Sequence, residues 1–431
     1  MKHTGWSNWS GSVTAKPQEM LTPSSIQEVA DAIRLCKREG RRLRVVGSGH
    51  SFTPLAATDD VLLSLDLLQG IVNVNVEEGT ATVWAGTKLK RLGEELFGYG
   101  LAQHNLGDID VQSIAGAIST GTHGTGLRLG NISTQLTAVT IVTGQGEIVE
   151  CTPESRPDWF KALQVSLGSL GVMVQVTLRL RRAYRLEYES RKIPLRQCLQ
   201  EAPALAEGNR HFEFFWFPYA EPCQIKLMNE TDKPASGSKM KDYVADVLLE
   251  NTAFGLLSGI CRTFPKTSPA ISRLSASQVP AMRKVDYSHR LFATQRLVRF
   301  NEMEYNVPAE SMVPVIEEMR ELMARRNYHV HFPVECRYAQ GDDIWLSPSY
   351  GRDSAYIAIH MYKGMPHQAY FEEMEELFVR FGGRPHWGKM HHLTGARLKE
   401  LYPMWDEFLR VRDEADPDRI LVNPYVEKLF Q

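Results

Sequence analysis

The first 150 residues alternate between helical and strand patterns of hydrophobicity. Apolar residues recur at helical spacing from residue 26 to 33, between a capping box formed by Ser25 and Glu28 and a stop signal at Gly40. Short apolar runs bounded by turn residues predict strands and hairpins. The pattern predicts strands at 43–46 and 61–65, hairpins at 71–76 with 81–84 and at 136–142 with 147–151, and a further helix at 88–101. This mixture of helices and strands indicates an α+β domain.

The pattern changes near residue 184. The stretch 231–239, TDKPASGSK, has the Pro, Gly and Ser content of a loop. The pattern beyond it predicts strands at 332–337 and 355–362 and helices at 315–326, 368–381 and 395–414. We therefore expect two domains, 1–183 and 184–431, and we expect the C-terminal helices of the second to return to the first.

Composition excludes several classes of protein. The chain has 431 residues, a formal net charge of -2, 43% hydrophobic and 23% charged residues, which is ordinary globular usage. A net charge this close to zero gives no electrostatic indication that the protein binds nucleic acid. The six cysteines form no C-x-x-C pair, so neither a zinc site nor a dithiol motif is indicated. Without an apolar leader or a membrane-spanning segment, the expected location is the cytoplasm.

The segment 47–51, GSGHS, directly follows a predicted strand. Its glycines let the backbone approach a ligand closely and present several N–H groups at once, which suits a pyrophosphate. The spacing is not G-x-G-x-x-G and no helical pattern follows at once, so a Rossmann site is not indicated. Taken alone, the segment is equally well interpreted as a tight turn.

A second segment, 113–126 (SIAGAISTGTHGTG), consists mainly of small residues, and no charge appears until Arg128. A bulky ligand lying against the backbone demands such a composition. Two segments of this kind in one domain favour a ligand pocket over ligand-free loops. His50 and His123 lie inside them. A lone histidine is usually a hydrogen-bonded structural residue, but imidazole is also a nucleophile that can become attached to an electrophilic cofactor.

The two glycine-rich segments, in this order, resemble the flavin domain of the vanillyl-alcohol oxidase superfamily. Motifs of the C-terminal half narrow the resemblance: VECR (334–337), GDDIWLSP (341–348), GRDS (351–354), HWGK (386–389) and Asp416-Pro417 before Asn423. As an ordered set they are similar to those of the sugar-1,4-lactone oxidases, which include gulonolactone and arabinonolactone oxidases and are related to the alditol oxidases. The resemblance implies an α+β fold with an N-terminal FAD-binding domain and a cap domain containing an antiparallel sheet.

The resemblance also implies which residues hold FAD. The first segment would wrap the pyrophosphate, His50 would be joined covalently to the flavin, and Met173 would touch the cofactor through its backbone. The implied cofactor-binding residues are Val45, Val46, Gly47, Ser48, Gly49, His50, Ser51, Gly107, Asp108, Ser113, Gly116, Thr120, Gly121, Thr122, His123 and Met173.

The candidate catalytic residues lie in the C-terminal half. Glu335 and Arg337 are two residues apart on a predicted strand, so their side chains share a face. We expect Glu335 to position or deprotonate the substrate hydroxyl and Arg337 to hold it. Lys389 adds a positive charge, which would either stabilise the reduced, anionic flavin or orient the substrate. His360 lies on a second predicted strand and is a further candidate for the pocket. Without the resemblance, the E-x-R pair would be interpreted as a surface ion pair.

Gly107 occupies the position that often controls oxygen access to the flavin in this superfamily. A glycine leaves room for oxygen, which favours an oxidase over a dehydrogenase. Asp108 departs from the alditol oxidases, which carry a substrate-contacting serine there. This departure weakens the alditol alternative.

We therefore predict an FAD-dependent oxidase that converts a secondary alcohol of a sugar-1,4-lactone (L-gulono-, L-galactono- or D-arabinono-lactone-like) to a ketone and reduces oxygen to hydrogen peroxide. The alternatives are an oxidase of polyols such as xylitol or sorbitol, a flavin-binding protein without turnover, and a nicotinamide dehydrogenase, for which the dinucleotide fingerprint is missing. Three histidines lie near Lys389 in the sequence: His386, His391 and His392. They lack a metal-ligand spacing such as H-E-x-x-H, so no metal is predicted.

Overall fold

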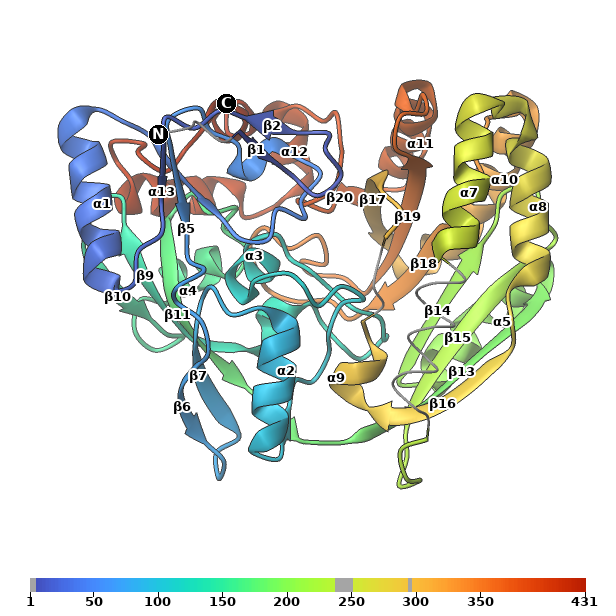
Figure 1. The fold of residues 1–431 in the computed structure, drawn as a ribbon, viewed down its shortest axis with the longest axis horizontal. Helices are drawn as coiled ribbons and strands as arrows, with labels where there is room; N and C mark the ends of the chain where they lie inside the picture. The colour runs from blue at the N-terminus through green and yellow to red at the C-terminus, as the bar shows by residue number, and fades with distance from the viewer. Residues whose placement is uncertain (1–4, 237–250, 294–296) are drawn as a thin grey trace.

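The computed structural model describes residues 5–236, 251–293 and 297–431. The chain forms two lobes with loops between them (Figure 1). The N-terminal lobe, blue to green, also contains the red helices near the C-terminus, and the other lobe is built on a large green-to-orange sheet. The prediction of an α+β fold with two domains is confirmed.

The N-terminal lobe is built on two sheets. An antiparallel sheet has the order β10-β9-β11-β7-β6, and a parallel sheet has the order β3-β5-β4. The strand bounds are Glu19–Leu21 (β3), Leu43–Val46 (β4), Val61–Ser64 (β5), Ile71–Asn75 (β6), Thr80–Trp84 (β7), Leu136–Thr143 (β9), Ile148–Cys151 (β10) and Gly171–Arg179 (β11). Both predicted hairpins are present, because β6 pairs with β7 and β9 with β10 in antiparallel register.

The large sheet is antiparallel throughout, with the order β16-β13-β15-β14-β18-β19-β17-β20. Its strands are Arg185–Pro194 (β13), His211–Trp216 (β14), Pro222–Glu230 (β15), Met282–Tyr287 (β16), Phe300–Pro308 (β17), Val334–Ala339 (β18), Ser354–Tyr362 (β19) and Arg384–Pro385 (β20). Residues of α5 (Leu195–Gly208), α10 (Met312–Arg326) and α11 (Gln368–Arg380) share a hydrophobic core with it. Helices α7 (Asn251–Thr263) and α8 (Ser268–Gln278) lie in the same lobe (Figure 1).

Strand alternation gives the central strands one apolar and one polar face. Phe214 of β14, Cys336 of β18 and Met303 of β17 point into the core that the helices share. Glu335 and Arg337, on either side of Cys336, are equally buried but point to the opposite face. The sheet therefore holds a row of buried charges on the face away from its helices.

The predicted N-terminal helix is present as α1 (Ile26–Glu39). The Ser25 side chain accepts a hydrogen bond from the Glu28 N–H, and Gly40 ends the helix in the left-handed conformation, with φ 65°. The helix predicted at 88–101 spans Leu89–Gly98 (α2). Of the predicted loop 231–239, residues 231–236 form neither helix nor strand, and 237–239 lie outside the described residues.

The prediction of one helix at 395–414 is wrong. The structure has two helices, α12 (Gly395–Leu401) and α13 (Trp405–Ala415), with Pro403 between them. Proline disfavours helical geometry in the residue before it, and Tyr402 is extended, with φ -110° and ψ 104°. Leu398 and Phe408 from these helices share a core with Val29 and Ile33 of α1.

A buried guanidinium ties together the segments behind the glycine-rich loop at 47–51. Arg44 of β4 donates hydrogen bonds to the carbonyl oxygens of Leu55 at 2.7 Å, Leu167 at 2.8 Å, Gly168 at 2.9 Å and Leu421. Burial lowers its pKa to about 10, so it stays cationic at neutral pH. One side chain therefore fixes the end of β4 against three other parts of the chain.

Among the described helices, none combines the length and the apolar character that a bilayer-spanning segment needs.

Candidate functional site

A cavity with about 1000 Å³ of empty space, part of it open to solvent, lies in the N-terminal lobe. The whole predicted segment 45–51 lines it, together with these other residues predicted to bind the cofactor: Ser113, Gly116, Thr120 and Met173. The two glycine-rich segments, more than 60 residues apart in the sequence, therefore meet at one cavity.

The cavity wall depends on glycine at two positions. A Cβ atom at Gly47 would overlap the Ser113 Oγ, and one at Gly86 would overlap the Leu65 carbonyl oxygen. Glycine at these two positions therefore lets neighbouring segments of the cavity wall pack closely against one another. The glycine-rich backbone and the small side chains that line the cavity fit a dinucleotide cofactor such as FAD.

His50 projects from the first glycine-rich segment into the same region. Its ring stacks on Trp9, with 5.6 Å between the ring centroids. Burial, helped by the positive charges of Lys389 and Lys88, lowers the pKa of His50 to about 4. The imidazole is therefore neutral at pH 7, the form in which it is a nucleophile.

The remaining predicted cofactor residues lie outside that cavity wall. Asp108 and His123 belong to a buried polar cluster beyond it, and a Cβ at Gly107 would lie 3.2 Å from the His123 carbonyl oxygen and 3.3 Å from the Thr122 methyl carbon. Gly121 has φ 70°, and a Cβ there would face Pro348 and Val165. The left-handed backbone at position 121 therefore explains why this residue is a glycine.

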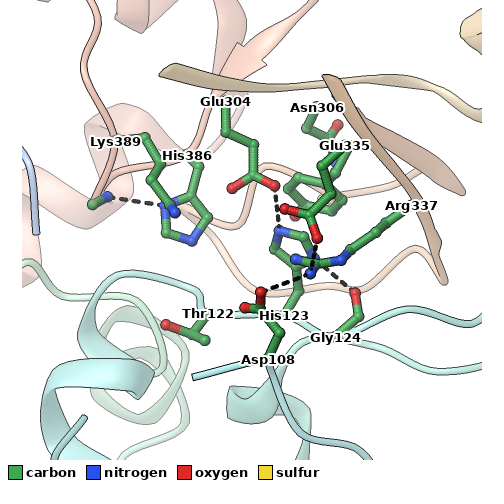
Figure 2. A network of polar contacts seen from close by, with 12 residues as sticks. Asp108, Thr122, His123, Gly124, Glu304, Asn306, Glu335, Arg337, His386 and Lys389 are labelled. Carbon is green, nitrogen blue, oxygen red and sulfur yellow. Dashed lines mark hydrogen bonds and ion pairs between the residues drawn. The ribbon is translucent and has the colours of Figure 1, made fainter. Parts of the chain in front are cut away.

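Arg337 lies at the centre of this polar cluster (Figure 2). Its Nε is 2.8 Å from the Glu213 carboxylate, and its Nη2 pairs with Glu335 and lies 3.2 Å from Asp108. Burial opposes the charge on the guanidinium, but Glu335, Asp108 and Glu213 together raise its pKa well above the usual value. Because Asp108 comes from a loop of the N-terminal lobe and the other carboxylates from the sheet, this ion cluster joins the two lobes.

A second group of charges lies on β17 and its neighbours. The Lys389 Nζ is 2.5 Å from Glu302, and the His360 Nε2 is 3.4 Å from the same carboxylate. Glu304, two residues along the strand, lies 3.1 Å from the His123 Nε2. Burial alone would lower the pKa of Lys389, but Glu302 and Glu304 outweigh it and raise this pKa. The lysine is therefore an ammonium ion inside the site.

All four predicted catalytic residues thus lie in one polar region, together with Asp108 and His123. Lys389 and Asp108 are half-buried there, and the others are buried. Among the described residues, two groups of three offer possible metal-ligand atoms within 4.8 Å of one another: His123, Glu304 and His386, and Glu302, Glu335 and His360. Arg337 and Lys389 already provide cationic partners for the carboxylates, and we assign no metal ion here.

Comparison with known proteins gives the family. The family model described as D-arabinono-1,4-lactone oxidase matches residues 176–429, more than half of the chain. The chain belongs to the D-arabinono-1,4-lactone oxidase family. A second model, described as FAD binding domain, matches residues 17–152, which include both glycine-rich segments, 47–51 and 113–126. The predicted membership of the sugar-lactone oxidase family is confirmed.

Relatives of this family match over the full length. The L-gulono-1,4-lactone dehydrogenase of Mycobacterium tuberculosis is 41% identical, with 99% of each chain covered. The L-gulonolactone oxidase of Bos taurus is 31% identical over 100% of this chain and 99% of the bovine protein. Among solved structures, cholesterol oxidase from B. sterolicum has a TM-score of 0.84 at 19% identity, with 99% of this chain and 96% of that chain covered. This structural likeness shows the fold alone.

Sequence reasoning missed several charged members of the site. Glu213 lies within the apolar strand HFEFFW, where a single carboxylate among aromatic residues is a signal of a buried, paired charge. Glu302 and Glu304 alternate with apolar residues along β17 in the pattern that identified Glu335 and Arg337. Asp66 lines the cavity but follows an ordinary strand, and nothing in its local sequence marks it.

Proposed function

We propose that this chain is an FAD-dependent oxidase of sugar-1,4-lactones, acting on L-gulono-, L-galactono- or D-arabinono-lactone or a close analogue. The observation that carries the proposal is the buried Glu335–Arg337 pair, on a strand of the sheet that faces the lobe with the glycine-lined cavity. Residues 1–183 would hold the cofactor, and residues 184–431 would supply the substrate site and return their C-terminal helices to the first domain. Family membership and the full-length relatives support this assignment.

The chemistry assigns a role to each side chain. Oxidation of a secondary alcohol removes a hydride from the carbon and a proton from the hydroxyl, and leaves a ketone. FAD, held by the residues that line the cavity, would supply the acceptor for the hydride and the means of passing two electrons, with two protons, to oxygen to give hydrogen peroxide. Glu335 accepts the hydroxyl proton, and Arg337 holds the substrate oxygen by hydrogen bonds. Lys389 contributes positive charge next to that oxygen, and His360 contributes a hydrogen-bonding ring nitrogen.

The predicted cofactor contacts complete the proposal. Residues Val45 to Ser51, Ser113, Gly116, Thr120 and Met173 would hold FAD within the cavity that they line. Gly107, Asp108, Thr122 and His123 would lie between the cofactor and the substrate, since they adjoin the polar cluster.

Anaerobic mixing with a panel of compounds tests the activity directly. We expect one or more sugar-1,4-lactones to bleach the oxidised flavin absorbance of the purified holoenzyme, with peroxide formed when air is readmitted. Bleaching by xylitol or sorbitol and by no lactone would show an alditol oxidase. A flavin that none of these compounds reduces would overturn the proposal.

We further propose that His50 is joined covalently to the flavin, because its neutral ring lies at the cavity wall. After denaturation in acid, flavin absorbance and fluorescence are expected to stay with the wild-type chain. H50A is expected to release its FAD on the same treatment. H329A, which changes an exposed histidine, serves as the matched control and should keep the flavin attached. Release of FAD from the denatured wild-type chain would show that the cofactor is bound without a covalent link.

Gly107 is proposed to give oxygen access to the flavin, since relatives include both a dehydrogenase and oxidases. G107A places a methyl group 3.2 Å from the His123 carbonyl oxygen. We expect it to slow reoxidation by oxygen about tenfold or more, a barrier increase of ~1.4 kcal/mol, while the anaerobic reduction rate stays within about twofold of wild type. Stopped-flow absorbance separates the two half-reactions.

The control for this variant is G98A, because a Cβ at Gly98 meets no atom within 4 Å. It should leave both half-reactions unchanged. Equal slowing of reduction and reoxidation in G107A would mean that Gly107 serves packing and not oxygen access.

A further inference from the structure

A short hairpin near the N-terminus packs against the loop that carries His50. It consists of β1 (Trp6–Ser7) and β2 (Thr14–Ala15), paired in antiparallel register. Figure 1 shows these strands in dark blue, close to the C-terminus of the chain. Trp6 lines the cavity together with the glycine-rich segment 47–51. The hairpin is therefore part of the wall of the proposed cofactor site.

Two consecutive residues of this hairpin hold the backbone on either side of His50. The Trp9 N–H donates a hydrogen bond to the Gly49 carbonyl oxygen at 2.7 Å. The Asn8 Nδ2 donates to the Ser51 carbonyl oxygen at 3.0 Å. The residues before and after His50 are therefore both tied to the hairpin, which fixes the point from which the imidazole projects.

The side chain of Asn8 also closes the hairpin. It is buried, and its Oδ1 accepts a hydrogen bond from the Val13 N–H at 3.0 Å. Its Nδ2 lies 3.2 Å from the Ser10 Oγ and 3.1 Å from the Ser12 Oγ. One amide therefore sets both the shape of the turn and the position of the hairpin against the loop.

The ring of Trp9 covers the imidazole of His50. The two rings are stacked, with 5.6 Å between their centroids and 21° between their planes. The indole is itself contacted edge-on by Phe300 of β17, at 5.2 Å between centroids, and by Phe52 at 6.3 Å. Because Phe300 belongs to the large sheet, both lobes contact the Trp9 ring. A ring held in this way limits the orientations that the His50 imidazole can adopt.

The HWGK motif (386–389) holds the loop further along the chain. The Phe52 N–H donates to the Gly388 carbonyl oxygen at 2.7 Å, and the Thr53 hydroxyl donates to that of Trp387 at 3.0 Å. These bonds begin beyond Ser51 and do not reach the stretch that carries His50. Loss of the hairpin contacts would therefore loosen His50 while the chain after it stays anchored.

We propose that Asn8 and Trp9 are positioning residues for the covalent attachment of FAD to His50. Asn8 fixes the backbone of the segment 47–51 at the cavity, and Trp9 fixes the plane of the imidazole. This inference rests on the covalent link put forward under the proposed function. Two reacting atoms must lie about 3–3.5 Å apart with their orbitals aligned, and a misplacement of about 1 Å can cost about 100-fold in rate. The contacts of Asn8 and Trp9 therefore act on the rate at which the bond forms.

The attachment needs no reactant beyond FAD and oxygen. A ring nitrogen of His50 forms a bond to a methyl carbon of the flavin, and the nitrogen and the carbon each lose one hydrogen. The flavin ring system takes up these two hydrogens with two electrons, and oxygen removes them again to give hydrogen peroxide. Full-length apoprotein, FAD and air are therefore enough to follow the step.

Reconstitution of the full-length apoprotein, prepared from cells starved of riboflavin, separates the binding of FAD from its attachment. Quenching of flavin fluorescence gives the affinity, and the flavin that stays with the chain after acid denaturation gives the attachment rate. W9A keeps the backbone hydrogen bond to Gly49 and loses the stacked ring. We expect its FAD affinity to stay within about threefold of wild type and its attachment to be at least about tenfold slower. W9F keeps an aromatic ring and should attach FAD within about threefold of the wild-type rate.

N8D tests the hold on the backbone. The introduced carboxylate cannot donate to the Ser51 carbonyl oxygen, whereas the hydroxyls of Ser10 and Ser12 can turn to donate to it, so the hairpin stays closed. We expect N8D to weaken FAD affinity about tenfold and to slow attachment at least about tenfold.

Two matched controls change the same residue types away from the hairpin. N73D alters an exposed asparagine of β6, and W159A removes a tryptophan that donates to Glu414 outside the cavity. Both should bind and attach FAD as the wild type does. The temperature of unfolding of each apoprotein shows whether a variant has lost its fold, and W9A with W9F decides the matter if N8D does not fold.

Attachment at the wild-type rate in both W9A and N8D would overturn the inference. An equal loss of FAD affinity and attachment rate in W9A, with a lower unfolding temperature, would also overturn it, because Trp9 would then serve folding alone. Release of FAD from the denatured wild-type chain would refute the covalent link and the role of Trp9 with it, whereas a weaker FAD affinity of N8D would still support the role of Asn8. An attached flavin that no lactone reduces would leave the inference intact and the proposed substrate class wrong.

Discussion

The buried charge of Arg337 is the constraint on which the rest of the site depends. A guanidinium removed from water is stable only when carboxylates and hydrogen bonds replace its hydration. Here Glu335 provides a carboxylate from the same strand, β18, Glu213 provides one from the neighbouring strand β14, and Asp108 provides a third from the loop of the other lobe. Removing one partner of such a buried pair typically costs about 3–5 kcal/mol, because the other charge is left uncompensated. The two lobes are therefore held together at the point where the chemistry is proposed to occur.

The large sheet makes this arrangement possible. Its strands carry apolar side chains toward the helices and charged side chains toward the N-terminal lobe, so one element provides both the core and the site. Each charge is then fixed by a strand that is hydrogen-bonded on both sides, as for Glu335 on β18 between β14 and β19. Groups mounted on strands keep their geometry better than groups on loops. The loops of the N-terminal lobe, in contrast, supply backbone and small residues to the cavity wall.

Sequence patterns predicted helices, hairpins and shared strand faces correctly where the pattern is contained within a few neighbouring residues. The capping box at Ser25, both hairpins of the N-terminal lobe and the shared face of Glu335 and Arg337 follow from spacing alone. The break at Pro403 could have been predicted from the same rules, but the helical pattern on either side of it masked the proline. The partners of Arg337 could not be predicted in this way, because Asp108, Glu213 and Arg337 are far apart in the sequence and meet only through the strand order.

The most direct test of the account is the rate at which substrate reduces the flavin in E335Q, measured anaerobically by stopped flow at saturating lactone. The account predicts a fall of about 100-fold or more, the usual contribution of a general base, with FAD content unchanged. D343N, which alters an exposed carboxylate of the nearby GDDI motif, should retain the wild-type rate. A full rate in E335Q would contradict the account, because the substrate proton would then leave by another group and the charges around Arg337 would serve structure alone.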